Sequence, residues 1–166
     1  LNKSDVSGII HLAALKLAGV EWDEDTYPSS QISLAAHGWF TLLKGLDSKL
    51  RTLENGIVVS VTTLDGRHGN VGELFNSMQA SATGITKSYS FEQPHLRARA
   101  LDLHPEIVLD ASHAAEIIAD DVFNTAGEVE IGIDRDGRRW ALVAFDEKLE
   151  AMREPLTSSD TWIVSG

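Results

Sequence analysis

The chain has 166 residues and a mass of 18.1 kDa, which is enough for one domain with its own hydrophobic core. Asp and Glu number 25 against 14 Lys and Arg, so the formal net charge is −11. This charge repels phosphate backbones and anionic lipids, and it argues against nucleic-acid or membrane partners. The lack of cysteine excludes disulfides and thiolate chemistry. With no apolar run of ~20 residues and no leader-like start, a soluble cytoplasmic protein is expected.

Short β-rich runs alternate with longer helical patterns in the first part of the chain. Residues 7–14 form a short apolar run of the kind that lies buried in a parallel sheet. A helix is predicted after Pro28, because apolar residues recur there at helical spacing: Ile32, Ala35, Trp39, Leu43 and Leu46. Residues 57–64 are dense in β-branched side chains, which is typical of a central strand.

The alternation continues after a polar, glycine-rich loop at residues 65–70. A second helix is predicted from the spacing of Met78, Ala82, Ile85 and Tyr89. Residues 97–103 alternate with a period of two and are predicted to form the third strand. A third helix follows, with either Asp110 or Ser112 as its cap. Its expected buried face is Ala115, Ile118 and Val122.

Two strands at residues 128–133 and 138–145 flank the sequence Asp-Arg-Asp-Gly at 134–137, which is a hairpin signal. A calcium loop begins in a similar way, but its later acidic ligands are missing, so a turn is expected. The order is therefore β-α-β-α-β-α followed by a hairpin. Right-handed crossovers make the first three strands parallel and adjacent. The predicted fold is α/β: a truncated Rossmann-like parallel sheet flanked by helices, with a C-terminal antiparallel hairpin.

Ligands of open α/β sheets bind outside the carboxyl ends of the strands. Three predicted loops lie there: residues 13–17, 64–71 and 104–109. The chain contains no G-x-G-x-x-G fingerprint, and turn chemistry explains the Gly66–Gly69 pair. The six histidines lack H-x-H or H-x-x-x-H spacing, so structural roles are expected. His68, in the second of these loops, is the histidine placed to contact a ligand or partner.

The stretch Ile57-Val-Val-Ser-Val-Thr-Thr-Leu-Asp-Gly-Arg-His-Gly-Asn70 resembles the fifth strand and following loop of short-chain dehydrogenases/reductases. Residues 84–92, Gly-Ile-Thr-Lys-Ser-Tyr-Ser-Phe-Glu, resemble the later part of that family's active-site helix, and residues 97–105 its sixth strand. Ile-Ile-His-Leu-Ala-Ala at 9–14 lies where the family has its fourth-strand Asn-Asn-Ala-Gly motif. The resemblance covers residues 7–105.

Catalysis in that family needs a Tyr general acid, a Lys one helical turn later and a Ser that orients the carbonyl. The Tyr-x-x-x-Lys spacing falls here on Phe75 and Gln79, and the serine position falls on Thr62 or Thr63. Phenylalanine has no proton to donate, and glutamine has no charge to lower a neighbour's pKa. The resemblance therefore implies a degenerate site, with no catalytic, cofactor-binding or metal-binding residues.

The family's first strand, with its glycine turn, is absent before residue 7, yet Thr161-Trp-Ile-Val-Ser-Gly166 looks like that strand. This order resembles the ketoreductase domains of polyketide synthases, and residues 65–69 and 87–95 look most like the polyunsaturated-fatty-acid synthase branch. The resemblance implies three parts: residues 1–145 as a truncated structural subdomain, 146–159 as a linker, and 160–166 as the first strand of a catalytic subdomain.

On this interpretation the chain is a non-catalytic module that stabilises an adjacent NADPH-dependent β-ketoacyl-reductase subdomain of a multidomain synthase. It binds no cofactor itself. Its expected partners are that catalytic subdomain, other synthase domains including the acyl carrier protein, and a second copy of the isolated chain, because exposed apolar surface favours self-association. Trp39 and Phe40 are expected in the core or at an interface, and Trp140 and Trp162 are candidates for interface anchors.

Two alternatives belong to different functional classes. One is a divergent short-chain dehydrogenase/reductase-like enzyme or nucleotide-binding protein that uses Thr62, Thr63, His68 and Lys87. The other is a free-standing adaptor with the same degenerate fold. Lys87 precedes Tyr89 by two residues, so the two side chains are expected on different sides of their helix rather than as a catalytic pair.

Overall fold

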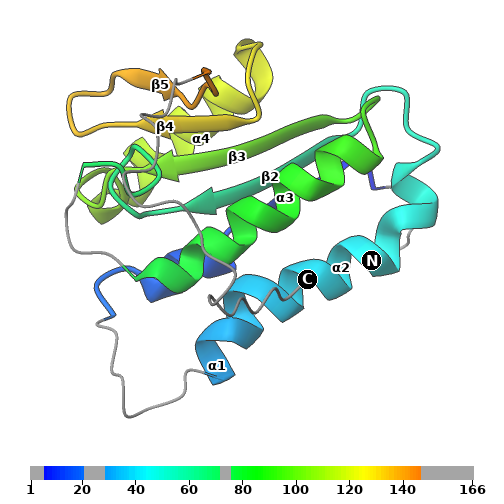
Figure 1. The fold of residues 1–166 in the computed structure, drawn as a ribbon, viewed down its shortest axis with the longest axis horizontal. Coiled ribbons are helices and arrows are strands. Elements are labelled where there is room, and N and C mark those ends of the chain that lie inside the picture. The colour runs from blue at the N-terminus through cyan, green and yellow to red at the C-terminus, as the bar shows by residue number, and fades with distance from the viewer. Residues whose placement is uncertain (1–5, 21–28, 72–75, 147–166) are drawn as a thin grey trace, which may run out of the picture.

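The computed structural model describes residues 6–20, 29–71 and 76–146, which form a five-stranded sheet with helices on both faces (Figure 1). The strands lie in chain order, β1 to β4 are parallel, and β5 is antiparallel to β4. This arrangement confirms the predicted α/β class and its C-terminal hairpin. The strand bounds are β1 Gly8–His11, β2 Ile57–Thr62, β3 Arg97–Leu103, β4 Glu130–Ile133 and β5 Arg139–Ala141.

The helix predicted after Pro28 begins at Ser29 in the described residues and continues to Leu50. It consists of α1 (Ser29–Ile32), a π-helical stretch (Ser33–His37) and α2 (Gly38–Leu50). Its predicted apolar stripe faces the sheet, with Ala35, Trp39 and Leu43 buried. The other helices are α3 (Ala80–Glu92) and α4 (Ala111–Asn124), and 3-10 turns occupy Ala13–Leu17, Ser77–Gln79 and Ile107–Leu109.

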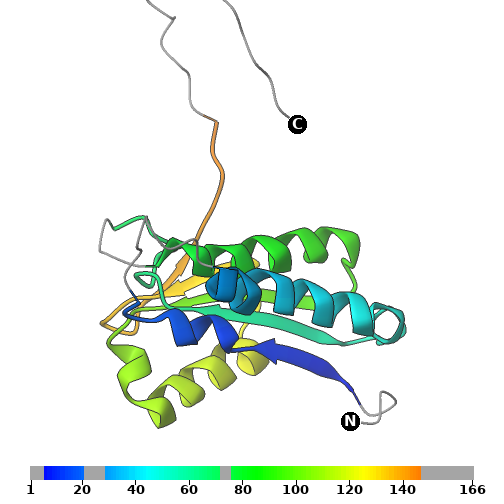
Figure 2. The ribbon, with the colours of Figure 1, turned by 90° about the horizontal axis from the view of Figure 1, so that it is seen from below.

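Two separate hydrophobic cores lie on the two faces of the sheet. Figure 2 shows α2 and α3 on one face and α4 on the other. Trp39 and Val58 belong to the core under α2 and α3. The next residue along β2, Val59, belongs with Ile118 to the core under α4. Both faces of the central strands are therefore covered, as in parallel sheets generally.

The connection from β3 to β4 has the opposite hand to the two connections before it. All three advance in the same direction across the sheet, but α4 crosses on the face opposite to α2 and α3 (Figure 2). Because about 98% of parallel crossovers are right-handed, a sheet that uses both hands is unusual. The helix of this connection is capped by Asp110, whose carboxylate accepts hydrogen bonds from the backbone N–H groups of Ser112 and His113.

Three sequence predictions are corrected in detail. Residues 97–103 do not alternate in burial: all but Arg97 are buried, because helices cover both faces of β3. On α4 the residue that joins Ile118 in the core is Ala114, while Ala115 is exposed. Strand β5 stops at Ala141 rather than continuing to residue 145.

The predicted linker, apart from its first residue, and the predicted strand at 160–166, including Trp162, lie outside the described residues. Within the described part of the chain, no helix has the length and apolar composition to span a membrane.

Candidate functional site

The carboxyl ends of β1, β2 and β3 meet at one edge of the sheet, and the three predicted loops follow them there. The centre of this edge is the buried carboxylate of Asp102, near the end of β3. It accepts hydrogen bonds from the Thr62 hydroxyl at 2.9 Å and from the backbone N–H groups of Leu64 at 2.7 Å, Asp65 at 3.3 Å and His68 at 2.9 Å. The carboxylate therefore holds the loop after β2 in place.

A second buried carboxylate closes the same loop from within. Asp65 accepts hydrogen bonds from the backbone N–H groups of Arg67, Gly69 and Val71 at 2.7–2.8 Å. Burial by itself raises the pKa of Asp65, but these three hydrogen bonds outweigh it, so the pKa lies below its ordinary value. The charged form of this carboxylate is part of the loop structure.

The loop also lies directly against the backbone of β4. Gly66 has φ +74°, and a Cβ atom there would overlap the carbonyl group of Ile133. A Cβ atom on Gly132 would in turn overlap the carbonyl group of Gly66. Gly69 also has positive φ, which confirms the predicted glycine turn. The loop therefore fills the edge of the sheet beside β4 with its own backbone.

The hairpin holds the loop through three side chains. The Arg67 guanidinium lies 3.8 Å from the centre of the Trp140 ring and 3.1 Å from the Asp134 carboxylate. The Trp140 indole N–H donates to Asp134 at 2.8 Å. Asp134 also accepts backbone hydrogen bonds from Asp136 and Arg138, which confirms the predicted hairpin turn. Burial raises the pKa of Asp134, but the hydrogen bonds prevail and lower it to about 2.

Thr62, Thr63 and Gln79, three of the four positions where the resemblance implies a degenerate site, lie close together at the end of β2. The Gln79 side chain accepts a hydrogen bond from the Thr63 backbone N–H at 2.8 Å and donates one to the Thr63 carbonyl at 3.1 Å. The Thr62 hydroxyl donates a hydrogen bond to the Asp102 carboxylate at 2.9 Å. The Thr63 hydroxyl is buried without a hydrogen-bond partner. Phe75, the fourth position, lies outside the described residues.

Asp102, which organises this edge, was not among the residues predicted from the sequence. Its signal was a carboxylate next to the last residue of an apolar strand, where burial demands hydrogen-bond partners. The strand was predicted to alternate between buried and exposed residues, so a charged residue within it did not indicate a buried carboxylate.

Other candidate side chains take part in structural contacts. Lys87 pairs with Glu130 at 2.5 Å, and the Tyr89 hydroxyl donates to Asp47 at 2.9 Å, so they lie on different sides of α3 as predicted. The His11 ring stacks on Trp39, and burial lowers the pKa of His11. No group of three or more acidic or histidine side chains suited to a metal is present in the described ranges.

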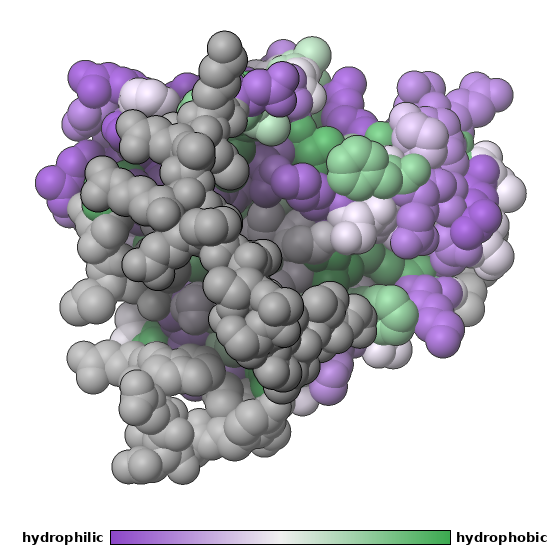
Figure 3. Space-filling view, viewed as in Figure 1, coloured by the Kyte–Doolittle hydropathy of each residue, from purple (hydrophilic) through white to green (hydrophobic). Residues whose placement is uncertain are grey.

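Several grooves lie away from this edge in the described part of the chain. One, of about 650 Å³ between α2 and α3, has Phe40, Leu43 and Ile85 in its lining and Asp47 beside Arg51 near one end. Figure 3 shows hydrophobic side chains, bordered by hydrophilic ones, on the face that carries these helices. Trp39 is buried in the core as predicted, while its neighbour Phe40 is 56% exposed in this groove.

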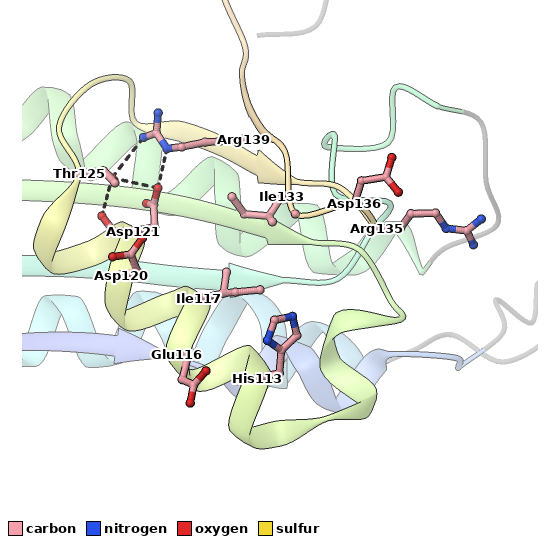
Figure 4. Close-up of a pocket in the computed structure, with 11 residues that line it drawn as sticks. His113, Glu116, Ile117, Asp120, Asp121, Thr125, Ile133, Arg135, Asp136 and Arg139 are labelled. Atoms are coloured by element: carbon pink, nitrogen blue, oxygen red, sulfur yellow. Dashed lines mark hydrogen bonds and ion pairs between the residues drawn. The ribbon is translucent and has the colours of Figure 1, made fainter.

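A second groove, of about 560 Å³, lies between α4 and the hairpin (Figure 4). Charged groups dominate its lining around Ile117 and Ile133. Asp121 is an internal ion-pair partner, since it contacts the buried Arg99 at 2.9 Å and Arg139 at 2.7 Å. These pairs tie α4 to β3 and β5.

Comparisons of the chain with protein-family models, with curated proteins and with solved structures found no match.

Proposed function

We propose that this chain is a non-catalytic, Rossmann-like structural subdomain. It stabilises an adjacent NADPH-dependent β-ketoacyl-reductase subdomain in a cytoplasmic multidomain polyketide or polyunsaturated fatty acid synthase, alongside domains such as the acyl carrier protein. The observation that carries the proposal is the pairing of Gln79 with Thr63. At the position where the resembled reductases place their lysine, this chain has an amide whose oxygen and nitrogen both bond one backbone residue.

The loop that packs over the carboxyl ends of the strands also supports a non-catalytic role. In the resembled reductases, substrate and cofactor approach the carboxyl ends of the strands. Here the two buried carboxylates at this edge bond the chain's own residues: Asp102 bonds Thr62 and three backbone N–H groups, and Asp65 bonds three more. Opening the edge for a ligand would break several charge-assisted hydrogen bonds at once.

The groove between α2 and α3 supports a role in packing against a neighbour. Phe40 is 56% exposed in it, and the half-buried Ile85 belongs to the same lining. Apolar surface flanked by charged groups such as Lys44 and Glu92 is typical of a surface that another domain covers. We assign this groove as the contact with the catalytic subdomain.

A pair of matched variants in the full-length protein tests this assignment. Phe40→Glu introduces a charge into the groove, while Phe123→Glu introduces it at an equally exposed position on α4, where the side chain is 57% exposed. The proposal predicts that Phe40→Glu lowers the melting temperature of the reductase subdomain and its NADPH-dependent reduction of a β-ketoacyl thioester. Phe123→Glu should leave both unchanged. Equal effects of the two variants, or none from either, would contradict the assigned groove.

The enzyme alternative has one observation in its favour. The Thr63 hydroxyl and both ring nitrogens of His68 are buried without hydrogen-bond partners at this edge. A divergent reductase would use such groups to hold a nucleotide, and it would bind NADPH without any neighbouring domain. A free-standing adaptor would bind no NADPH and would show no coupling to a reductase.

A further inference from the structure

The end of the hairpin carries an apolar segment that leaves the sheet. Strand β5 ends at Ala141, and its last ladder hydrogen bond joins the Leu142 N–H to the Glu130 carbonyl at 3.3 Å. The next residues run out from the body of the molecule in an extended course, drawn in orange in Figure 2. Residues 140–146 are called the β5 arm here. Val143 is 68% and Phe145 79% exposed in it.

The β5 arm lacks the features that normally keep an edge strand from pairing. Natural edges are protected by lysines, prolines, bulges or a covering element. From Trp140 to Phe145 the arm has neither charge nor proline, and the part of the chain that the structure describes places nothing on its outer side.

The ladder with β4 decides which backbone groups face outward. Arg138 and Leu142 bond to β4 through their own backbone groups, so the even-numbered residues face β4. In an antiparallel ladder the alternate residues then face the opposite edge. The N–H and C=O groups of Ala141 therefore face outward. Val143 and Phe145 lie beyond the end of β5, and continuing the same alternation into the arm makes their N–H and C=O groups available to a further strand.

We propose that the β5 arm pairs in antiparallel fashion with the β5 arm of a second copy, about a two-fold axis at Val143. In this register Ala141 lies opposite the second copy's Phe145, and Leu142 opposite the second copy's Ala144. Each large side chain thus faces a small one, and the outward backbone groups meet in hydrogen-bonded pairs. A two-fold interface requires this kind of self-complementarity.

Charge supports the same register. It places the second copy's Asp146 opposite Trp140, the ring that the Arg67 guanidinium covers at 3.8 Å. An anionic group then lies beside a cation at each end of the paired segment. The side chain of Ala141 is on the α4 face with Ile131, so the second copy's Phe145 would extend that apolar face.

The net charge of −11 opposes association at long range. Salt should screen the long-range repulsion between two chains of charge −11 more than it weakens the single Asp146–Arg67 attraction at each end, and it leaves the apolar pairing intact. The dimer is therefore expected to tighten as the salt concentration rises. It forms whether or not the chain supports a reductase, so its failure would leave the proposed function standing.

Sedimentation equilibrium of the 166-residue chain tests the pairing, at salt concentrations from about 0.1 M to about 1 M. The wild type should be a dimer at micromolar concentration, and Val143→Glu should be a monomer. Leu109→Glu is the matched control, because it has the same net charge and changes a side chain that is 84% exposed outside the arm. It should remain a dimer. Circular dichroism verifies that both variants are folded.

Amide hydrogen exchange gives a second readout. The N–H groups of Val143 and Phe145 should exchange more slowly as the protein concentration rises, while those of an exposed loop should not change. A wild-type chain that stays monomeric overturns the proposal. So does a dimer that survives Val143→Glu, because it would form through another surface.

Discussion

Gln79 and Thr63 are joined by two hydrogen bonds, one from the Thr63 N–H to the amide oxygen at 2.8 Å and one from the amide nitrogen to the Thr63 carbonyl at 3.1 Å. The amide thereby satisfies both backbone groups of a residue that has just left the β-ladder. Gln79 is fully buried, so water cannot replace it. The pair fixes the start of α3 to the end of β2, which is a structural role for a position that carries lysine in the resembled reductases.

Gln79→Leu should therefore lower the free energy of unfolding by ~2–4 kcal/mol, because it leaves two buried backbone groups without partners. Thr83→Val, one turn further along α3, is the control. The Thr83 hydroxyl is buried and already lacks a partner, so its removal should be neutral or slightly stabilising. Urea denaturation measures both. A loss in Gln79→Leu no greater than that in Thr83→Val would contradict the structural role.

Asp102→Asn should destabilise the loop after β2. An asparagine offers one acceptor oxygen where the carboxylate now serves Thr62 and three backbone donors. We expect a loss of about 3 kcal/mol and faster amide exchange at Leu64 and His68. Asp110→Asn, a cap position where asparagine serves as well as aspartate, should change stability by less than about 0.5 kcal/mol. Unaltered exchange at His68 in Asp102→Asn would show that the carboxylate does not hold the loop.

Stability should fall in acid through Asp134. Its pKa is about 2 in the folded protein against 3.8 ordinarily, so the folded state favours the ionised form. The resulting stabilisation is fully present above about pH 4 and is lost as the pH falls toward about 2. Trp140→Phe removes one donor to the carboxylate, so the folded pKa should rise and the loss should become smaller. Unfolding free energies of the wild type and of Trp140→Phe, measured between pH 5 and pH 2, give the dependence of stability on pH for each protein. Equal dependence in the two proteins would refute the hydrogen bond from Trp140 to Asp134.

Two glycine-to-alanine substitutions should change the stability of the protein in opposite directions. Gly66→Ala places a Cβ against the Ile133 carbonyl in a residue with φ +74°, and it should cost about 2 kcal/mol or more. Gly84→Ala lies in α3 with nothing within 4 Å of the new atom, and it should stabilise by roughly 0.5–1 kcal/mol. Thermal unfolding distinguishes the two. A tolerated Gly66→Ala would mean that the loop is not packed tightly against β4.

The parallel strands could be predicted closely, because runs such as residues 57–64 are rich in β-branched side chains and end at glycine-rich turns, whereas the last strand was predicted to extend four residues too far. The site could not be predicted to the same depth. Whether Thr62 or Thr63 meets Asp102 depends on a one-residue shift, which moves a side chain to the other face of a strand. The hand of the α4 connection depends on which face the helix covers, and the helical spacing of its apolar residues is the same on either face.

The titration of NADPH into the 166-residue chain, followed by calorimetry and by nucleotide fluorescence, tests the central claim most directly. We predict no saturable binding by the wild type, nor by Gln79→Lys, in which the lysine of the resembled reductases is restored to an edge that the loop fills. Saturable binding by the wild type, weakened by Thr63→Val or His68→Ala, would contradict the structural role and would identify the chain as a nucleotide-binding protein.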